Sequence, residues 1–409
     1  MKTIYTLLIL IYSMVVNITA LFSLKARQWV KGRRGWKEKV SSFDRQESKV
    51  LWIHCASLGE FEQGRPLIEK ICGEMRGWKI VLTFFSPSGY EIRKEYPHAD
   101  LIMYLPADTP FNANYFLNRI RRDMVFIVKY EFWYNFLNQL KRRKIPTYLV
   151  SGIFRPTQYF FRWYGRYATR MFSVFTHMFV QEEASKLLLK SIGYANCTVT
   201  GDTRFDRVSQ IATAAKDIPL IEKFRGSEKL FVAGSSWEQD EEIITAYIND
   251  YPGRMKWIFA PHEINTAHLE RIEKHLRVPS ARYSSYREDD NESRVMIIDN
   301  IGMLSSGYKY ASIAAVGGGF GKGIHNILEP ACWGIPVMFG PNCGKFREAE
   351  ELISRGGASL FTDFITFAAV VDKYLSDQQE LKRAGDVCAS YVIENKGATD
   401  KVFDYVFPL

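Results

Sequence analysis

The chain has 409 residues, of which 47% are apolar and 24% are charged, and its formal net charge is +9. This balance excludes a disordered or fibrous protein, and the length predicts two domains of roughly 180 residues each. The six cysteines are scattered singly without a CxxC pair, which argues against a zinc ribbon or a disulfide scaffold. The basic excess favours an anionic partner without identifying it.

The N-terminal stretch predicts contact with a membrane. Residues 3–24 contain no charged side chain, and as a helix they would measure roughly 33 Å, enough to cross a hydrocarbon core of about 30 Å. Seven basic residues follow between positions 25 and 39, opposed only by Glu38. We therefore expect a membrane anchor over residues 1–24, with the rest of the chain in the cytoplasm. A cleaved signal is the competing interpretation, and a helix lying in the membrane surface also stays open.

After this stretch, short apolar runs alternate with helical patterns, as in βαβ units. Strands are predicted over residues 49–56, 79–85, 101–105, 124–128, 147–150, 178–180 and 198–200, and then over 229–233, 257–260, 295–298, 312–316 and 336–339. The region around 206–226 has no strand pattern. It predicts a hinge over 211–226 between an N-terminal domain (25–210) and a C-terminal domain (227–409). Ligands of two such doubly wound sheets bind at the carboxyl ends of the strands.

Two carboxylates follow predicted strands of the first half. Glu60 lies in Ser57-Leu58-Gly59-Glu60, and Glu131 comes shortly after the strand over 124–128. Acid and base chemistry is one interpretation of such a pair. Ser57 and Glu60 also have the spacing of a capping box, which is the stronger interpretation from spacing alone. Glu131 has its own structural alternative, an acidic residue stabilised at the start of a helix.

A glycine-rich segment follows the predicted strand that ends at Val316. Five of the seven residues 317–323 are glycine, and His325, Asn326 and Glu329 come directly after them. Glycines at a strand end let backbone amides approach an anion closely, so a ligand loop is favoured over a simple helix cap. The spacing fits neither the phosphate-loop pattern nor the dinucleotide fingerprint, so ATPase and NAD-dependent functions lose support.

Three further motifs each follow a predicted strand: 200–206, 234–237 and 261–263. They supply Arg204 and His262, side chains that can donate hydrogen bonds to a phosphate. The acidic residues Asp202, Asp206, Asp289 and Asp290 do not form a convincing divalent-metal cluster. We therefore expect metal-independent chemistry with no cofactor.

Taken together, the ordered motifs resemble the Kdo (3-deoxy-D-manno-octulosonic acid) transferases of lipopolysaccharide synthesis. The resemblance runs from the N-terminal stretch to about Gly357, and it is most specific in Ser-x-Gly-Glu (57–60) combined with the His-Asn-x-x-Glu-Pro run (325–330). It implies an inverting glycosyltransferase of GT-B architecture, with two facing Rossmann-like domains. The implied reaction moves Kdo from CMP-Kdo to a lipid A precursor of the lipid IV-A type, at the cytoplasmic face of a bacterial inner membrane.

The resemblance also implies roles for individual residues. Glu60 is implied as the general base, and Glu131 and Arg204 as stabilisers of the transition state. This chain departs from the family pattern at Arg204, where many members carry lysine. The residues implied to contact CMP are Pro261, His262, Gly302, Met303, Leu304, Asn326, Ile327, Leu328 and Glu329.

Two alternatives remain at this stage. Another GT-B transferase, or an epimerase, that uses a UDP-sugar would show a similar pattern. A membrane-tethered nucleic-acid-binding protein is suggested by basic patches at 119–122 and 141–144, but these are more simply solvated or lipid-phosphate-facing surface. We therefore expect no nucleic acid among the partners.

Overall fold

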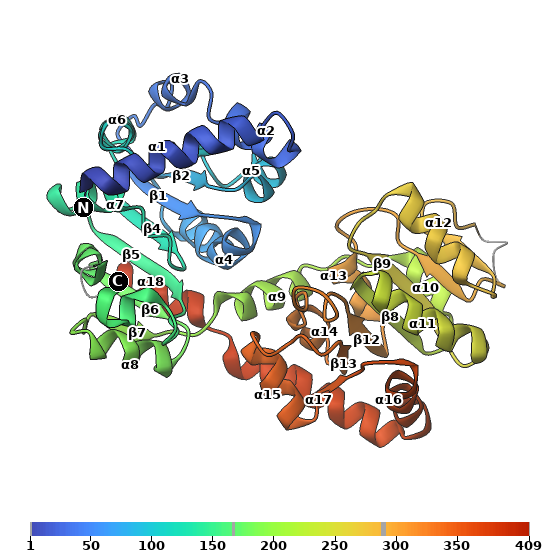
Figure 1. Ribbon diagram of the computed structural model, residues 1–409. Coiled ribbons are helices and arrows are strands. Elements are labelled where there is room, and N and C mark those ends of the chain that lie inside the picture. The colour runs from blue at the N-terminus through green and yellow to red at the C-terminus, as the bar shows by residue number, and fades with distance from the viewer. Residues whose placement is uncertain (1, 166–167, 288–291, 409) are drawn as a thin grey trace. The chain divides into compact units, whose positions relative to one another are not determined.

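The computed structural model describes residues 2–165, 168–287 and 292–408. The chain divides into two compact units, one of residues 1–207 with 397–409 and one of residues 208–396. Each unit contains a parallel sheet covered by helices (Figure 1). This confirms the prediction of two parallel-sheet α/β domains of the GT-B type.

The sheet of the first unit has seven strands in the order β3-β2-β1-β4-β5-β6-β7. Their bounds are β1 Lys49–Cys55, β2 Trp78–Phe84, β3 Leu101–Tyr104, β4 Met124–Val128, β5 Thr147–Gly152, β6 His177–Val180 and β7 Cys197–Val199. The helices of this unit are α1 Lys2–Thr19, α2 Leu24–Gly32, α3 Trp36–Ser41, α4 Leu58–Glu74, α5 Pro87–Arg93, α6 Pro110–Ile120, α7 Tyr134–Arg142, α8 Glu183–Ser191 and α18 Ala398–Val406, with 3-10 turns η1 Tyr159–Phe161, η2 Trp163–Gly165 and η3 Ala168–Val174. All seven strands predicted for this half are present.

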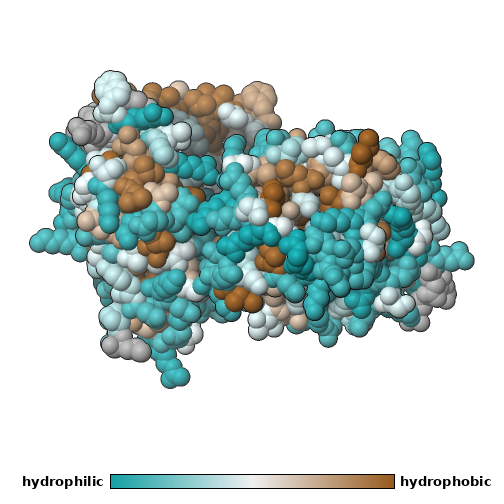
Figure 2. Space-filling view, turned by 90° about the horizontal axis from the view of Figure 1, so that it is seen from below, coloured by the Kyte–Doolittle hydropathy of each residue, from teal (hydrophilic) through white to brown (hydrophobic). Residues whose placement is uncertain are grey.

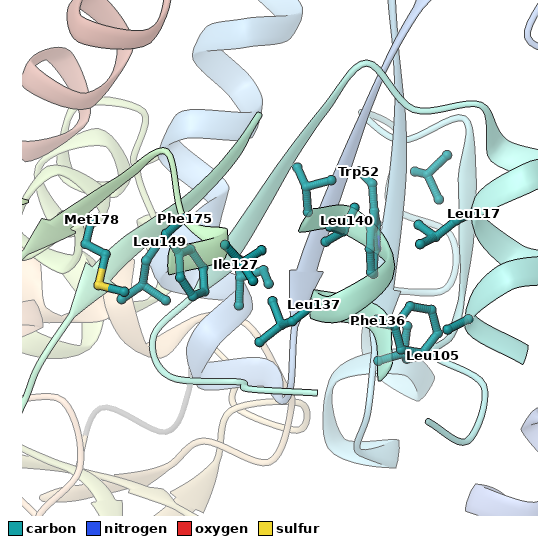
Figure 3. Close-up of a cluster of buried hydrophobic side chains, with 14 of the residues drawn as sticks. Trp52, Leu105, Leu117, Ile127, Phe136, Leu137, Leu140, Leu149, Phe175 and Met178 are labelled. Carbon is teal, nitrogen blue, oxygen red and sulfur yellow. The ribbon is translucent and has the colours of Figure 1, made fainter. Parts of the chain in front are cut away.

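The strands are buried on both faces, as parallel strands under helices must be. Six of the seven β1 residues are buried, which explains the nearly continuous apolar run that predicted this strand. On one side of the sheet, Trp52 and Ile127 pack against Phe136 and Leu137 of α7 (Figure 3). This packing fixes the position of α7, whose first turn comes just after Glu131.

The sheet of the second unit also has seven strands, in the order β10-β11-β9-β8-β12-β13-β14. Their bounds are β8 Leu230–Ser236, β9 Lys256–Pro261, β10 Ser280–Arg282, β11 Val295–Ile297, β12 Ile313–Val316, β13 Val337–Phe339 and β14 Ala358–Leu360. The helices are α10 Pro219–Arg225, α11 Glu238–Asp250, α12 Thr266–His275, α13 Leu304–Gly307, α14 Leu328–Cys332, α15 Arg347–Arg355, α16 Phe364–Ser376 and α17 Gln378–Asn395, with the 3-10 turn η4 Tyr308–Tyr310. The five strands predicted here are present, and the edge strands β10 and β14 were not predicted.

The domain boundaries differ from the predicted ones at both ends of the second unit. The division falls inside one helix, α9 Thr203–Thr213, rather than in a loop. The C-terminal residues 397–409 belong to the first unit, although we predicted a second domain that ran to 409. The cause is local: Asp206 accepts hydrogen bonds from the backbone N–H groups of Gly397 and Thr399, while Val402 and Phe403 join the first unit's core.

The predicted membrane-spanning anchor over residues 1–24 is not supported by the structure. Among the described residues, no helix combines the length and the apolar character that a bilayer crossing requires. Helix α1 ends at Thr19 after 18 residues, roughly 27 Å, and the chain then turns before Ser23 caps α2. The inner side of α1 packs on its own unit, where the Tyr5 hydroxyl donates a 2.8 Å hydrogen bond to Asp108.

The outer side of α1 remains exposed. The face in Figure 2 is mainly hydrophilic, with hydrophobic residues gathered in patches. By contrast, α1 and the turn after it carry a continuous set of exposed apolar residues: Ile4, Leu7, Leu8, Leu10, Ile11, Met14, Val15, Ile18, Leu21 and Phe22.

Candidate active site

The two predicted carboxylates of the first unit follow neighbouring strands. Strand β1 has β2 on one side and β4 on the other, so the chain order of the sheet reverses at β1. In an open parallel sheet, the crevice at the carboxyl ends of such strands is the usual ligand site. Glu60 comes after β1 on α4, and Glu131 comes after β4. The fold therefore brings both to the position where chemistry is expected.

Glu60 is not engaged in a capping box. Ser57 is the N-cap residue of α4, but its side chain makes no hydrogen bond to the backbone of the first turn. The Ser57 hydroxyl instead donates to Oε2 of Glu60. The carboxylate is only half-buried. The capping interpretation, which spacing favoured, therefore lacks its defining hydrogen bond.

Glu131 is partly buried, as Glu60 is. Burial and the nearby charge of Glu60 raise the pKa of Glu131 to about 7, although a hydrogen bond with the Trp133 side chain acts in the opposite direction. A carboxylic acid with this pKa exchanges its proton near neutral pH.

A buried histidine supports this pair from the sheet. His54 lies on β1, and its Nδ1 is 2.9 Å from the Thr83 hydroxyl on β2. The indole N–H of Trp133 donates to Nε2 of His54 over 3.2 Å, so Nε2 is the acceptor and Nδ1 carries the proton. Burial lowers the pKa of His54 to about 3, so the 4.0 Å approach to Glu131 is not an ion pair.

The hydrogen bond between Trp133 and His54, next to Glu131, was not predicted from the sequence. The signal was a polar residue inside an otherwise apolar strand. Such a residue needs a partner, but the sequence does not say which partner it has.

Arg204 is held in the same unit by acidic and amide side chains. Its Nε donates to Oδ2 of Asp202 over 2.8 Å, and Gln63 of α4 donates to Oδ1 of the same carboxylate over 3.0 Å. Burial alone would raise the pKa of Asp202, but Arg204 and these hydrogen bonds hold it below its ordinary value. Gln63 is one helical turn after Glu60, so α4 carries both Glu60 and the residue that fixes Asp202.

The second unit has its own reversal of strand order at β8, which lies between β9 and β12. Three rings gather at the carboxyl ends of these strands. Trp237 stacks on His262 with ring centroids 4.8 Å apart, and His262 stacks on His325 at 4.3 Å. The Trp237 indole N–H also donates to Nε2 of His325 over 3.0 Å. Burial, with the nearby His262, lowers the pKa of His325 to about 4, so this ring is neutral.

The glycine-rich loop after β12 forms because the backbone is packed too closely for side chains. A Cβ atom on Gly317 would lie 2.3 Å from the Ser235 carbonyl oxygen, and one on Gly319 would lie 2.5 Å from the Gly340 nitrogen. Gly318 has φ of +93°, and its N–H donates to the buried carboxyl of Asp240 over 3.1 Å. The glycines therefore serve first to fold the loop against neighbouring backbone.

The predicted CMP contacts surround this loop. Glu329 accepts hydrogen bonds from the Ser305 hydroxyl at 2.5 Å and from the Asn326 amide at 3.1 Å. The exposed Gly302 and the partly buried Met303 and Leu304 follow β11. Pro261 ends β9, with His262 next to it, and Ile327 and Leu328 are buried. Pro261 is thus the last residue of its strand, and the other eight residues come after the carboxyl ends of strands in the same sheet.

Within the described ranges, no group of three or more histidine, cysteine, aspartate or glutamate side chains could hold a metal ion. Asp202 is bonded to Arg204, and Asp206 binds the start of α18. Asp289 and Asp290 lie outside the described residues.

Comparison with known proteins decides the family. A family model described as 3-deoxy-D-manno-octulosonic-acid transferase (kdotransferase) matches residues 30–207. A 3-deoxy-D-manno-octulosonic acid transferase from Aquifex aeolicus is 30% identical over 314 residues, covering 76% of this chain and 81% of that protein. This chain belongs to the Kdo transferase family. A relative of the same description from Haemophilus influenzae is 24% identical and covers 99% of this chain and 97% of its own length.

Solved structures agree on the fold. A UDP-GlcNAc 2-epimerase from Neisseria meningitidis covers 88% of this chain and 100% of its own, with a TM-score of 0.62 and 16% identity. The corresponding epimerase from Methanocaldococcus jannaschii covers 84% and 99%, with a TM-score of 0.55 and 16% identity. At such low identity this likeness shows a common architecture and nothing about the substrate.

Membership of the Kdo transferases makes the chain a glycosyltransferase and supports Kdo transfer in lipopolysaccharide biosynthesis. The roles of the individual site residues stay predictions, because no comparison assigns them.

Proposed function

We propose that this Kdo transferase moves Kdo from CMP-Kdo to a hydroxyl group of a lipid A precursor of the lipid IV-A type. The observation that carries the proposal is the arrangement of Glu60 beside Glu131 at the reversal point of the first sheet, with Glu60 outside any capping box. A half-buried carboxylate at that place can accept a proton from a substrate hydroxyl.

In the proposed reaction, the acceptor oxygen forms a bond to the anomeric carbon of Kdo as the bond from that carbon to the CMP phosphate breaks. The hydroxyl proton goes to Glu60, and CMP leaves with the electron pair of the broken bond. Inversion follows from a single displacement. Glu131, with its pKa near 7, and Arg204 would stabilise the charges that develop. A guanidinium suits the departing phosphate because it donates directed hydrogen bonds.

The nucleotide would bind the second unit at its own reversal point. The stacked rings of Trp237, His262 and His325 offer a flat surface for a base, and Glu329 offers carboxylate oxygens for ribose hydroxyls. No cofactor or metal has a part in this proposal.

The chain would work at the cytoplasmic face of a bacterial inner membrane, with α1 lying in the membrane surface. The exposed apolar side of α1 and Phe22 in the turn after it, which is 88% exposed, would enter the lipid, and the exposed Lys25 would meet anionic headgroups. Arg33 does not take part, because it donates to the carbonyl oxygens of Phe85 and Leu105.

The reaction is tested by incubating the purified chain with CMP-Kdo and lipid IV-A, with UDP-sugars in parallel. We expect a lipid product heavier by Kdo, found by mass spectrometry, together with released CMP. Transfer from a UDP-sugar, or none from CMP-Kdo, would contradict the proposal.

Membrane association has a separate test, flotation with anionic vesicles. The double variant Ile11→Asp/Ile18→Asp should lose vesicle binding, because both side chains lie on the exposed side of α1. Ile92→Asp is the matched control, since Ile92 is exposed on α5 of the same unit. Equal flotation of all three proteins would rule out α1 as the lipid contact.

A further inference from the structure

A cavity of about 360 Å³ lies in the first unit outside the site described above. Its walls come from α7 and the segment just before it, from η1 and η3, and from one residue on the inner side of α1. The lining residues are Tyr5, Phe132, Tyr134, Leu137, Asn138, Lys141, Tyr159, Arg170, Met171 and Val174.

The lining residues differ in burial and in charge. Leu137 and Val174 are buried, whereas Lys141 and Arg170 are exposed. The Lys141 amine donates to the Ser173 hydroxyl over 2.5 Å, which places it beside η3. No carboxylate is among the lining residues. The cavity therefore has an apolar interior and a basic rim, which complements a molecule with a hydrocarbon part and an anionic head.

The size of the cavity limits what it can hold. Pockets for small molecules usually measure about 300–1,000 Å³, and this one is at the lower end of that range. One alkyl chain fits such a volume, but the body of a multi-chain lipid does not.

The location of the cavity links it to two features already described. Tyr5 belongs to α1, whose opposite side carries the exposed apolar residues. Phe132 follows Glu131 directly in the chain. The cavity therefore borders both the helix proposed to contact the membrane and the segment that carries Glu131.

We propose that this cavity binds one acyl chain of an anionic lipid, whose phosphate lies at Lys141 and Arg170. This inference rests on the proposed function, because it takes that lipid to be the acceptor. The cavity would then hold the acceptor while its hydroxyl is deprotonated.

The test uses dodecyl phosphate below its critical micelle concentration, titrated calorimetrically into the full chain without CMP-Kdo. We expect saturable binding of one molecule per chain. Affinity should rise about fourfold per methylene from octyl to dodecyl phosphate, since each buried methylene contributes about 0.8 kcal/mol. Ethyl phosphate and inorganic phosphate supply the head without the chain, and dodecyltrimethylammonium supplies the chain with a cationic head.

Two matched pairs of variants on α7 locate the binding. Asn138→Trp places an indole in the cavity and should weaken binding by tenfold or more, while Gln139→Trp, next to it but outside the lining, should not. Lys141→Gln should weaken binding about tenfold through the loss of a charged hydrogen bond. Arg142→Gln removes the same charge from the same helical turn and should change little. Met171→Trp fills the cavity from η3 if Asn138→Trp does not fold.

Several outcomes would overturn this inference. Equal affinity of the Asn138→Trp and Gln139→Trp proteins would place the amphiphile elsewhere, as on the exposed side of α1. Ethyl or inorganic phosphate binding as tightly as dodecyl phosphate would reveal an ionic surface site only. Equally tight binding of dodecyltrimethylammonium would show that the basic rim does not contribute to recognition of the head group.

The failure of this inference can be told apart from failure of the proposed function. If probe binding depends on Asn138 and Lys141 but no Kdo is transferred from CMP-Kdo, the cavity is an amphiphile site and only the proposed reaction is contradicted. Normal transfer by wild type and by Asn138→Trp, with no probe binding, would remove only the cavity.

Discussion

The two units have the same sheet architecture but different chemistry at the same topological position. In the first unit, the strands that flank the reversal lead to two carboxylates, and the pKa of one of them is raised to about 7. In the second, they lead to a glycine loop and stacked rings, of which His325 is kept neutral by a pKa of about 4. The sheet determines where a ligand binds. The segments after the strands determine whether the site supplies carboxylates for proton transfer or aromatic rings for stacking.

The largest effect on turnover is expected from a substitution of Glu60, the proposed base in the first unit. Glu60→Gln should lower Kdo turnover roughly 100-fold to 10,000-fold, because the amide cannot accept the hydroxyl proton. Thermal melting and CMP binding should stay close to wild type, since no capping bond is lost. Glu74→Gln, at the exposed end of the same helix, is the control and should keep full turnover. Near-normal turnover of Glu60→Gln would leave Glu131 as the first carboxylate to examine.

Substitutions in the second unit should weaken CMP binding, which Glu60→Gln in the first unit leaves unchanged. His262→Ala and Glu329→Ala should weaken CMP binding about 10-fold to 100-fold, because each removes a group proposed to contact the nucleotide. Calorimetric titration with CMP measures this loss, and Glu60→Gln provides the comparison from the first unit. Equal losses in all three proteins would point to general destabilisation and would remove the division of roles between the units.

A third prediction concerns the stability of the first unit. The pKa of Glu131 is about 7 in the fold, above its ordinary value of 4.5, so the unfolded chain loses this proton at lower pH. As the pH rises from 4.5 to 7, Glu131 therefore lowers the free energy of unfolding. Glu131→Gln should be more stable than wild type at pH 8, by up to about 3 kcal/mol, and equally stable near pH 4. Urea unfolding at several pH values measures this, and a difference that is constant with pH would show a packing effect instead.

The smallest effect is expected where α1 meets the first unit. Tyr5→Phe removes the hydrogen bond to Asp108 and should lower the free energy of unfolding by roughly 1 kcal/mol. CMP binding should not change, because the bond lies wholly within the first unit. Hydrogen exchange of the α1 amides would show the loosening directly. Unchanged exchange would mean that apolar packing alone holds α1.

The sequence predicted the central parts of both sheets because their strands are buried on both faces and read as apolar runs. It missed β10 and β14, which are three residues long, lie at sheet edges and include partly exposed positions. It also overestimated α1 as an anchor. Absence of charge over residues 3–24 does not reveal that Ser13, Asn17 and Thr19 bond to carbonyl oxygens one turn earlier, or that the helix stops at Thr19.

For the site, the sequence could place Glu60 and Glu131 at strand ends, but it could not distinguish a cap from a base. That distinction depends on which group the Ser57 hydroxyl bonds to, and both choices have the same spacing. The hydrogen bond from Gln63 to Asp202 and the ring stack at His262 join residues from separate elements, so only the fold brings them together.

The attachment of residues 397–409 to the first unit has a practical consequence for anyone who cuts or tags this chain. Shortening the C-terminus would remove Val402 and Phe403 from the first unit's core and would leave Asp206 without these hydrogen-bond donors. The loss of stability should therefore appear in the first unit, which is far away in sequence. Residues 208–396 make up one uninterrupted segment and suit separate expression. The first unit would need its last thirteen residues joined back through an artificial linker, as a circularly permuted gene could supply.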